Sequence, residues 1–289
     1  MNVGIALAFV AMLCWGLGDF WIQRSTRKIG VLSSLFFITA FGVVVLLPFV
    51  YKDLPVILNA DFETLAVIAA LCLVLLIAAF LDFEALRVGK LAVVEPIWSF
   101  EVPVAAFLAF FILDEKITGL QTLLILMLLF GLVLVSVREK IKFRQAFLEK
   151  GTILAFLGAL FMGASNFFMG WGARLSDPIM INFLADLFIA VFTGGLLLFT
   201  GRFKQTVRDM LDNKQMLLQM SIPDKVAWLA FAFAMSLAPI AIATALSESY
   251  IIVAVILGLA VNKEKIHPHQ KAGLIIAVIS AIILAATTS

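Results

Sequence analysis

Residues 138–150 read Arg-Glu-Lys-Ile-Lys-Phe-Arg-Gln-Ala-Phe-Leu-Glu-Lys and form the most polar junction of the 289-residue chain. On either side, the sequence is a series of apolar stretches separated by short connections. Because this junction divides the chain nearly in half, it predicts two units of similar size. We place them at residues 1–138 and 151–289, joined by a polar linker over residues 139–150.

The composition is that of a membrane protein. Hydrophobic residues make up 63% of the chain, charged residues 14%, and the mean hydropathy is +1.12. This excludes an ordinary soluble domain. A membrane-spanning helix needs about 20 apolar residues, and ten stretches meet that need. We therefore expect an all-α integral membrane protein with ten transmembrane helices, over residues 3–23, 31–50, 65–88, 92–113, 118–137, 151–173, 178–200, 216–238, 241–262 and 268–287.

Lysine and arginine gather in alternate connections between these stretches. The odd-numbered connections hold 17 of the 21, whereas the even-numbered ones hold only Lys52, Lys116 and Arg174. Cytoplasmic loops carry the excess of Lys and Arg. The pattern predicts a multi-pass protein of the inner (plasma) membrane whose N- and C-termini are both non-cytoplasmic.

The two halves resemble each other in sequence. Residues 15–20 align with residues 162–167, residues 85–90 with 234–239, and residues 114–117 with 263–266. Five spans is an odd number, so the second half must cross the membrane in the opposite direction to the first. Two inverted five-helix repeats are a common plan of secondary transporters, with the substrate site near the midplane between the repeats.

Three motifs resemble the EamA-type repeat of the drug/metabolite transporter superfamily: the Trp15-Gly16 element, the Phe83–Lys90 turn, and the segment from Glu101 to Ile117. The resemblance covers both halves. It implies a ten-helix bundle with a central cavity that exports amino acids or other small metabolites. Glu84 stands where the family often has an aromatic residue, and the second half has Tyr250 where the first has Glu101. The resemblance therefore does not imply a particular substrate.

Acidic residues inside the predicted spans are the strongest candidates for a site. A charged side chain at a helix centre costs about 2.5–3.5 kcal/mol even on the insertion scale. Seven facing lipid would together exceed the usual stability of a folded protein. We therefore expect these side chains to face the interior, to be paired or to be protonated. The seven are Asp19, Asp82, Glu84, Glu95, Glu101, Asp186 and Glu248.

Glu101 is the leading candidate for substrate binding. It lies about ten residues into the span at 92–113, with Trp98 one turn earlier on the same face. We expect Pro103 to kink the helix and to free the carbonyl of Ser99. A carboxylate, an indole and a free carbonyl would form a binding corner for a cationic or zwitterionic group. The alternative is a structural hydrogen bond from Glu101 to a neighbouring helix.

Other polar and aromatic residues are expected to complete the substrate site. Asp186 and Glu248 lie about two turns into their spans and could line the second half's share of the cavity. The alternative is that they form hydrogen bonds between helices. The further candidates for substrate binding are Tyr250, Asn166 and Trp15.

A second group of residues is expected to act in coupling or gating. Glu84 and Arg87 are three residues apart on one helical face, and Glu95 returns to them after the turn. They form either a structural ion-pair cluster or a cytoplasmic gate for protons. Asp19 is also expected to act in coupling or gating.

Asp224-Lys225 has two interpretations. The alignment of the halves puts it in the middle of a broken helix as a buried ion pair. Local composition puts it at the membrane interface instead.

Residues 202–218 read either as an amphipathic helix at the cytoplasmic surface or as a solvated loop.

The remaining motifs favour few other functions. Gly16-Leu17-Gly18-Asp19 matches the pattern of intramembrane aspartyl proteases, for which Asp82 or Asp186 would be the second aspartate. His267-Pro268-His269 lacks further metal ligands. No phosphate-binding loop with Gly-Lys-Ser/Thr is present. We expect no catalytic residue, metal or cofactor.

The expected function is a secondary transporter, an exporter of amino acids or related small metabolites by alternating access. It would work by proton coupling or uniport, and the alternative is an organic cation (multidrug) efflux transporter. The expected partners are a small-molecule substrate and the lipid bilayer, without nucleic acid, and a homo-oligomer is left open.

The charge pattern predicts the topology of the two ends. Alkaline phosphatase fused after Ser289 should be active, because this end is expected outside the cytoplasm, and green fluorescent protein there should stay dark. The same reporters fused after Lys142 should give the opposite results. A fluorescent fusion at Ser289 would contradict the predicted orientation.

Overall fold

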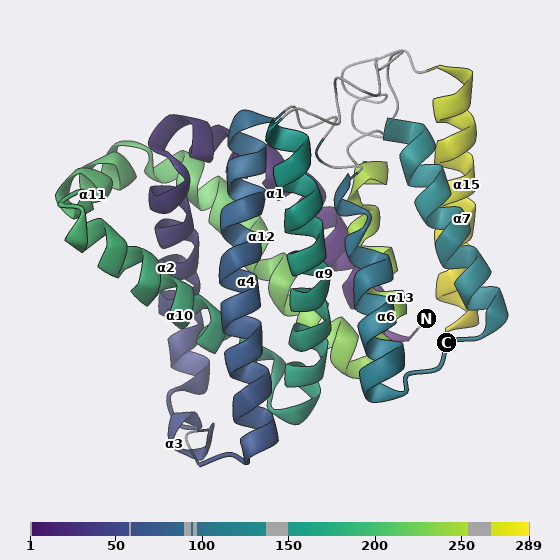
Figure 1. Cartoon of the computed structure of the whole chain (residues 1–289), viewed down its shortest axis with the longest axis horizontal. Helices are drawn as coiled ribbons and strands as arrows, with labels where there is room; N and C mark the ends of the chain where they lie inside the picture. Colours follow the sequence, from purple (N-terminus) through teal and green to yellow (C-terminus); the bar gives the residue numbers. More distant parts are fainter. Residues whose placement is uncertain are drawn as a thin grey trace.

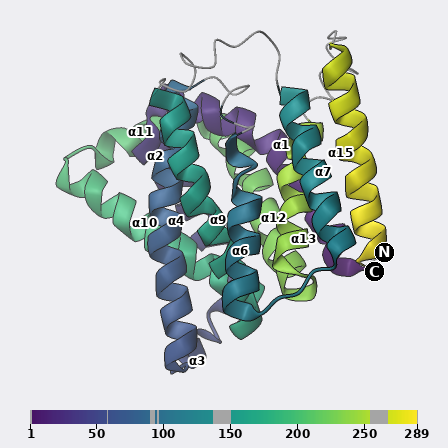
Figure 2. The same cartoon turned by 45° about the vertical axis from the view of Figure 1, so that its right-hand side comes forward.

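The computed structural model describes residues 2–57, 59–89, 94, 97–136, 150–253 and 267–288, and within them it contains helices but no strands (Figures 1 and 2). The helices of the first half are α1 (Val3–Ile29), α2 (Val31–Val50), α3 (Leu54–Ile57), α4 (Phe62–Val88), α6 (Glu101–Leu113) and α7 (Gly119–Ser136). Those of the second half are α9 (Lys150–Leu175), α10 (Pro178–Phe199), α11 (Phe203–Asp212), α12 (Lys214–Leu237), α13 (Ile240–Ser247) and α15 (Pro268–Thr287).

Local sequence accounts for where several helices begin. The Asp61 carboxylate accepts a hydrogen bond from the Thr64 backbone N–H at 2.8 Å and starts α4. Asp177 caps α10 in the same way, ahead of Pro178 in the first turn. Gly30 alone separates α1 from α2, with φ at 87°, a backbone conformation that favours glycine. Asp61 and Asp177 start helices close to the expected positions, whereas α1 continues to Ile29, beyond the expected end at residue 23.

Seven of the helices in the described ranges are long and apolar enough to cross a membrane: α1, α2, α4, α7, α9, α10 and α15. Helix α12 is also long but carries Asp224 and Lys225 near its middle. Helix α6 and the segment Ile240–Val253 are shorter apolar helices. The chain is therefore an all-α multi-span protein, and the number of ten crossings stays a prediction.

The predicted kink at Pro103 is wrong. Helix α6 begins at Glu101, after a turn in which the Phe100 N–H donates to the Ile97 carbonyl at 3.1 Å. Pro103 therefore lies in the first turn of a helix, where backbone N–H groups have no intrahelical partner, so the proline ring costs no hydrogen bond. The break in the helix precedes Glu101, and Glu101 begins a helix rather than lying ten residues inside one.

The second half departs from regular α-helix at the matching place. Helix α13 ends at Ser247, a 3₁₀ turn covers Glu248–Tyr250, and residues 251–253 are helical again, so the segment Ile240–Val253 stays helical throughout. Residues 99–100 are thus a break in the first half, whereas residues 248–250 are a local tightening of a helix in the second.

The two halves pack across one another in matched pairs. Helix α4 lies on α9 and α1 lies on α12, while α2 pairs with α10 and α7 with α15. Glycines on α1 and α9 lie against the backbone at corresponding positions of the opposite half. A Cβ at Gly16 would lie 3.3 Å from the Tyr250 carbonyl oxygen, and one at Gly163 would lie 2.7 Å from the Glu101 carbonyl oxygen. The chain ends lie on the same side of the bundle (Figure 1).

Helices α7 and α15 depend on glycine for their close approach. A Cβ at Gly273 would lie 2.7 Å from both the Gly131 carbonyl oxygen and the Leu134 Cβ. We expect Gly273→Ala to force the helices apart and to lower the melting temperature in detergent, at a cost of about 1–3 kcal/mol. Gly195→Ala is the control, because no atom lies within 4 Å of a Cβ there. Equal melting temperatures for the two variants would contradict this packing.

Candidate functional site

A cavity of about 130 Å³ lies where the two halves meet. Its walls come from α1, α2, α4, α9, α10 and α12, together with residues at the break before α6 and in the 3₁₀ turn after α13. The ionisable residues among those that line it are Asp19, Asp82, Glu101, Asp186, Asp224, Glu248 and Lys225. The aromatic ones are Trp15, Phe83, Trp98, Trp228 and Tyr250. The cavity is therefore strongly acidic, with aromatic walls.

The structure brings together every residue that we proposed for substrate binding. Glu101, Trp98, Tyr250, Glu248, Asp186, Asn166 and Trp15 all line the cavity. Three of the residues assigned to coupling or gating, Asp19, Asp224 and Lys225, line it as well. No contact among the described residues separates substrate binding from coupling, so both roles remain predictions.

Glu101 is held by the opposite half of the molecule. It is 4% exposed, and one of its carboxylate oxygens accepts a hydrogen bond from Asn166 Nδ2 at 3.1 Å. Its place in the first turn of α6 stabilises its negative charge, because the helix dipole is positive at that end. The bond to a neighbouring helix, which we expected as the alternative to a binding role, is present. Both residues still face the cavity, so the two roles are compatible.

Lys225 forms a buried ion pair with Asp186, from α12 to α10. The buried interpretation of Asp224-Lys225 is therefore the one that the structure shows. Two details of that interpretation are wrong. Lys225 pairs with Asp186 rather than with Asp224, and α12 runs through Pro223 without a break.

The ion pair fits because α2 has a glycine beside it. A Cβ at Gly42 would collide with the Asp186 carboxylate and would lie 2.7 Å from Lys225 Cε. Gly158 in α9 makes room for Asp82 in the same manner, since a Cβ there would collide with Oδ1 of that carboxylate. Two glycines thus give space to two buried acidic groups.

Asp82 and Trp98 interact with each other at the cavity wall. The two side chains lie within reach of a hydrogen bond, although Asp82 Oδ1 and Trp98 Nε1 are buried and make no hydrogen bond of regular geometry among the described residues. Both residues line the cavity. The contact therefore joins α4 to the segment that precedes Glu101.

An aromatic cluster closes one wall of the cavity. The Trp15 ring meets the Trp228 ring edge to face, with centroids 5.4 Å apart, and the Phe231 ring at 5.1 Å. Phe231 is fully buried. Edge-to-face pairs of this type add to the stabilisation from burial, and they hold the indole of Trp15 in a fixed position.

The Glu84–Arg87 ion pair is present but lies outside the cavity. Arg87 Nε and Nη2 donate to the two carboxylate oxygens at 2.7 and 2.6 Å. Lys150 Nζ lies 3.6 Å from the same carboxylate, a contact that we did not predict. Glu95 lies outside the described residues. A gating role for these residues stays a prediction.

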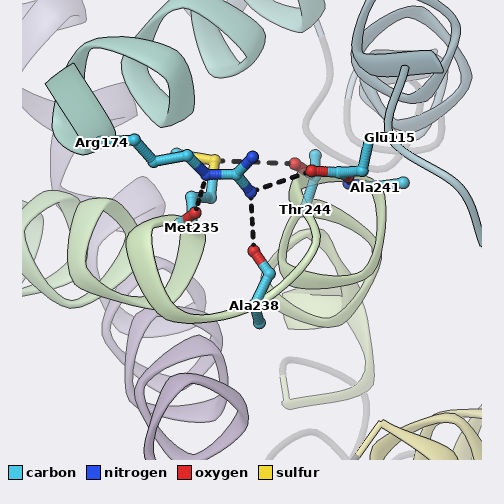
Figure 3. A network of polar contacts seen from close by, with 6 residues as sticks. All are labelled: Glu115, Arg174, Met235, Ala238, Ala241 and Thr244. Carbon is cyan, nitrogen blue, oxygen red and sulfur yellow. Dashed lines mark hydrogen bonds and ion pairs between the residues drawn. The ribbon is translucent and has the colours of Figure 1, made fainter. Parts of the chain in front are cut away.

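Arg174 forms a polar network that the sequence analysis missed (Figure 3). Its Nη2 donates to Glu115 Oε2 and to the Ala238 carbonyl, both at 2.9 Å, and its Nε donates to the Met235 carbonyl at 2.9 Å. The Ala241 N–H donates to the same glutamate at 3.3 Å. Arg174 is one of only three basic residues in the even-numbered connections, and its rarity there could have indicated that it has a structural partner.

The described residues include no group of three or more His, Cys, Asp or Glu side chains able to hold a metal ion. His267 and His269 stack with ring centroids 5.6 Å apart. His267 also begins α15, where its backbone N–H donates to Gln270 Oε1 at 3.0 Å. The histidine cluster therefore has a structural role at a helix start.

Helix α11 (Phe203–Asp212) lies within the segment for which we considered an amphipathic helix or a loop. The structure shows that residues 203–212 are helical. Helix α12 begins separately at Lys214.

Comparisons with known proteins agree with the fold. The sequence profile of the EamA-like transporter family matches residues 2–137 and again residues 149–286. A solved structure titled only as the crystal structure of a protein is similar in fold, with a TM-score of 0.74 at 14% identity. The match covers 99% of this chain and 97% of that one. No curated protein sequence matches the chain significantly.

The contact between Arg174 and Glu115 should stabilise the packing of the end of α9 against the loop that follows α6. Arg174→Gln should lower the melting temperature, because it leaves Glu115 and two backbone carbonyls without their donor. In a double-mutant cycle with Glu115→Gln, we expect a coupling of about 1 kcal/mol. Lys116→Gln in the same loop is the control, since Lys116 and Asp114 form an exposed pair at 3.5 Å. Additive effects of the two substitutions would contradict the coupling.

Proposed function

Because the chain belongs to the EamA-like transporter family, we propose that it is a secondary transporter that exports small organic solutes bearing an amino group, amino acids among them. The family and the apolar helices make it a multi-pass membrane transporter. The substrate class, the direction and the mechanism are our proposal.

The observation that carries the proposal is the charge of the cavity. Six carboxylates and one ammonium group line it, drawn from both halves of the molecule. Such a cavity attracts positive charge, because desolvated carboxylates need a compensating cation or proton. An amino group could be received by Glu101, with Trp98 and Tyr250 close enough to the same space to add cation–π attraction.

The Arg174 network supports a state that is closed on the predicted outer side. On α1, α2 and α4 the residues that line the cavity lie from the middle of the helix toward the end predicted to be cytoplasmic, whereas on α9 and α10 they lie toward the opposite end. The cavity therefore lies near the middle of the bundle. At the C-terminal end of α9, the Arg174 network joins the second half to Glu115 of the first. A joined outer side fits a state that takes up substrate from the cytoplasm.

The irregular segments beside the cavity support alternating access. Residues 99–100, a break, and residues 248–250, a 3₁₀ turn, occupy equivalent places in the two halves and flank the cavity. Irregular helical geometry of this kind allows a span to bend, so that one half can rock against the other around a fixed site. Release of the Arg174 contacts would open the outer side in the same movement.

Protons are a candidate coupling ion. Carboxylates that lose their compensating cation when substrate leaves can take up a proton instead. Uniport requires only the substrate gradient and fits the same cavity. The matching family consists of transporters, which argues against the protease interpretation. Of its two candidates for the second aspartate, Asp186 is engaged by Lys225, and Asp82 lines the same cavity as Asp19.

Counterflow in proteoliposomes tests the proposal. Proteoliposomes that contain the wild-type protein and are loaded with unlabelled amino acids and amines should take up the labelled compounds. Glu101→Gln should reduce the initial rate of uptake at least about tenfold, since loss of a buried charge partner costs several kcal/mol. Glu63→Gln, on the exposed first turn of α4, is the matched control. Uptake by Glu101→Gln equal to wild type would remove Glu101 from the site, and no uptake of any compound would contradict the proposed substrates.

A further inference from the structure

The cavity holds a single amine among its described lining residues, and that amine is already bound. Lys225 is the lysine, its side chain is 6% exposed, and it contacts the Asp186 carboxylate, whose side chain is 10% exposed. Asp224, the residue before it, lies in the same cavity. The positive charge of the site is therefore neutralised inside the protein before any ligand arrives.

The position of the ion pair is built into the packing. Gly42 on α2 lies directly against both partners, and any side chain there would collide with the Asp186 carboxylate. Lys225 and Asp186 project from α12 and α10, two of the helices that contact α2. The pair thus lies beside α2 at the wall of the cavity, and Lys225 cannot leave Asp186 without leaving a buried carboxylate unpaired.

This arrangement has different consequences for anionic and cationic ligand groups. A carboxylate that sought Lys225 would have to replace Asp186 and leave that aspartate buried and unpaired, which is strongly unfavourable. It would also enter a space that already holds five other acidic side chains. An ammonium group meets the opposite situation, because Glu101, Glu248 and their neighbours offer negative charge without displacing any cation.

We propose that Asp186 is a specificity-determining residue: by holding Lys225, it denies carboxylates a cationic partner, so that the cavity prefers amines without a carboxyl group to the corresponding amino acids. This rests on the proposed function, since it assigns the substrate class of the same cavity. Trp15, Trp98 and Trp228 provide aromatic surfaces for the carbon skeleton and for the cationic group.

The test uses pairs of ligands that differ only in the carboxyl group. Binding of phenethylamine and phenylalanine, and of agmatine and arginine, would be measured by the intrinsic tryptophan fluorescence of the full-length protein in detergent. In the wild type we expect each amine to bind at least about tenfold more tightly than its amino acid. In Asp186→Asn, Lys225 is free to meet a carboxylate, so the preference should shrink or reverse.

Three further variants make the result specific. The double variant Asp186→Asn/Lys225→Gln should lose the gain in amino acid binding, because the freed ammonium is gone. Asp186→Glu should restore the preference for amines. Asp212→Asn, an exposed aspartate at the end of α11, should behave as wild type. If Asp186→Asn does not fold, Lys225→Gln alone serves, and it should keep or increase the preference for amines.

The proposal is overturned if the wild type binds the amino acids as tightly as the amines, if it binds neither member of any pair, or if the preference is the same in Asp186→Asn. Binding is measured without flux, so its outcome is independent of counterflow. A preference for amines together with absent counterflow would leave the specificity intact and contradict transport. Counterflow of amino acids by a protein that binds amines no more tightly than amino acids would support transport and contradict the specificity.

Discussion

The high cost of placing a charge in the hydrocarbon core is the constraint on which the rest of this structure depends. A span that carries an acidic residue must turn it away from lipid, and the helices of this protein turn six of them toward one cavity between the two halves. The apolar faces that remain are what a bilayer requires. Orientation of the helices and assembly of the site are therefore consequences of the same free-energy term.

Glycine and the irregular segments make room for these groups. Gly42 and Gly158 give space to Asp186 and Asp82, and the break before Glu101 and the 3₁₀ turn after Ser247 bring irregular backbone to the cavity. Irregular backbone is tolerated at membrane depth only where protein or a water-filled space surrounds it. The features that would weaken an ordinary helix are thus concentrated where the molecule has a functional reason for them.

The two halves are similar in outline but differ in the charges they contribute. Lys225 and Asp186 both belong to the second half, and the corresponding stretches of the first half, residues 76–78 and 37–39, carry no charge. The Glu101–Asn166 hydrogen bond and the Arg174–Glu115 pair instead connect one half to the other. Repeat symmetry sets the scaffold, while the selectivity that we propose rests on the places where the symmetry fails.

The sequence by itself determined the membrane class, the two repeats and the set of candidate residues, because apolar length, charge placement and internal similarity are local properties of the chain. The expected bounds at residues 31–50 and 268–287 agree with α2 and α15. Only the tertiary structure decided that Lys225 pairs with Asp186, that Glu101 begins a helix, and that Arg174 holds Glu115. These contacts join residues that are distant in sequence. No periodicity or spacing encodes which of several buried acidic groups a given cation will reach, since that depends on the packing of whole helices.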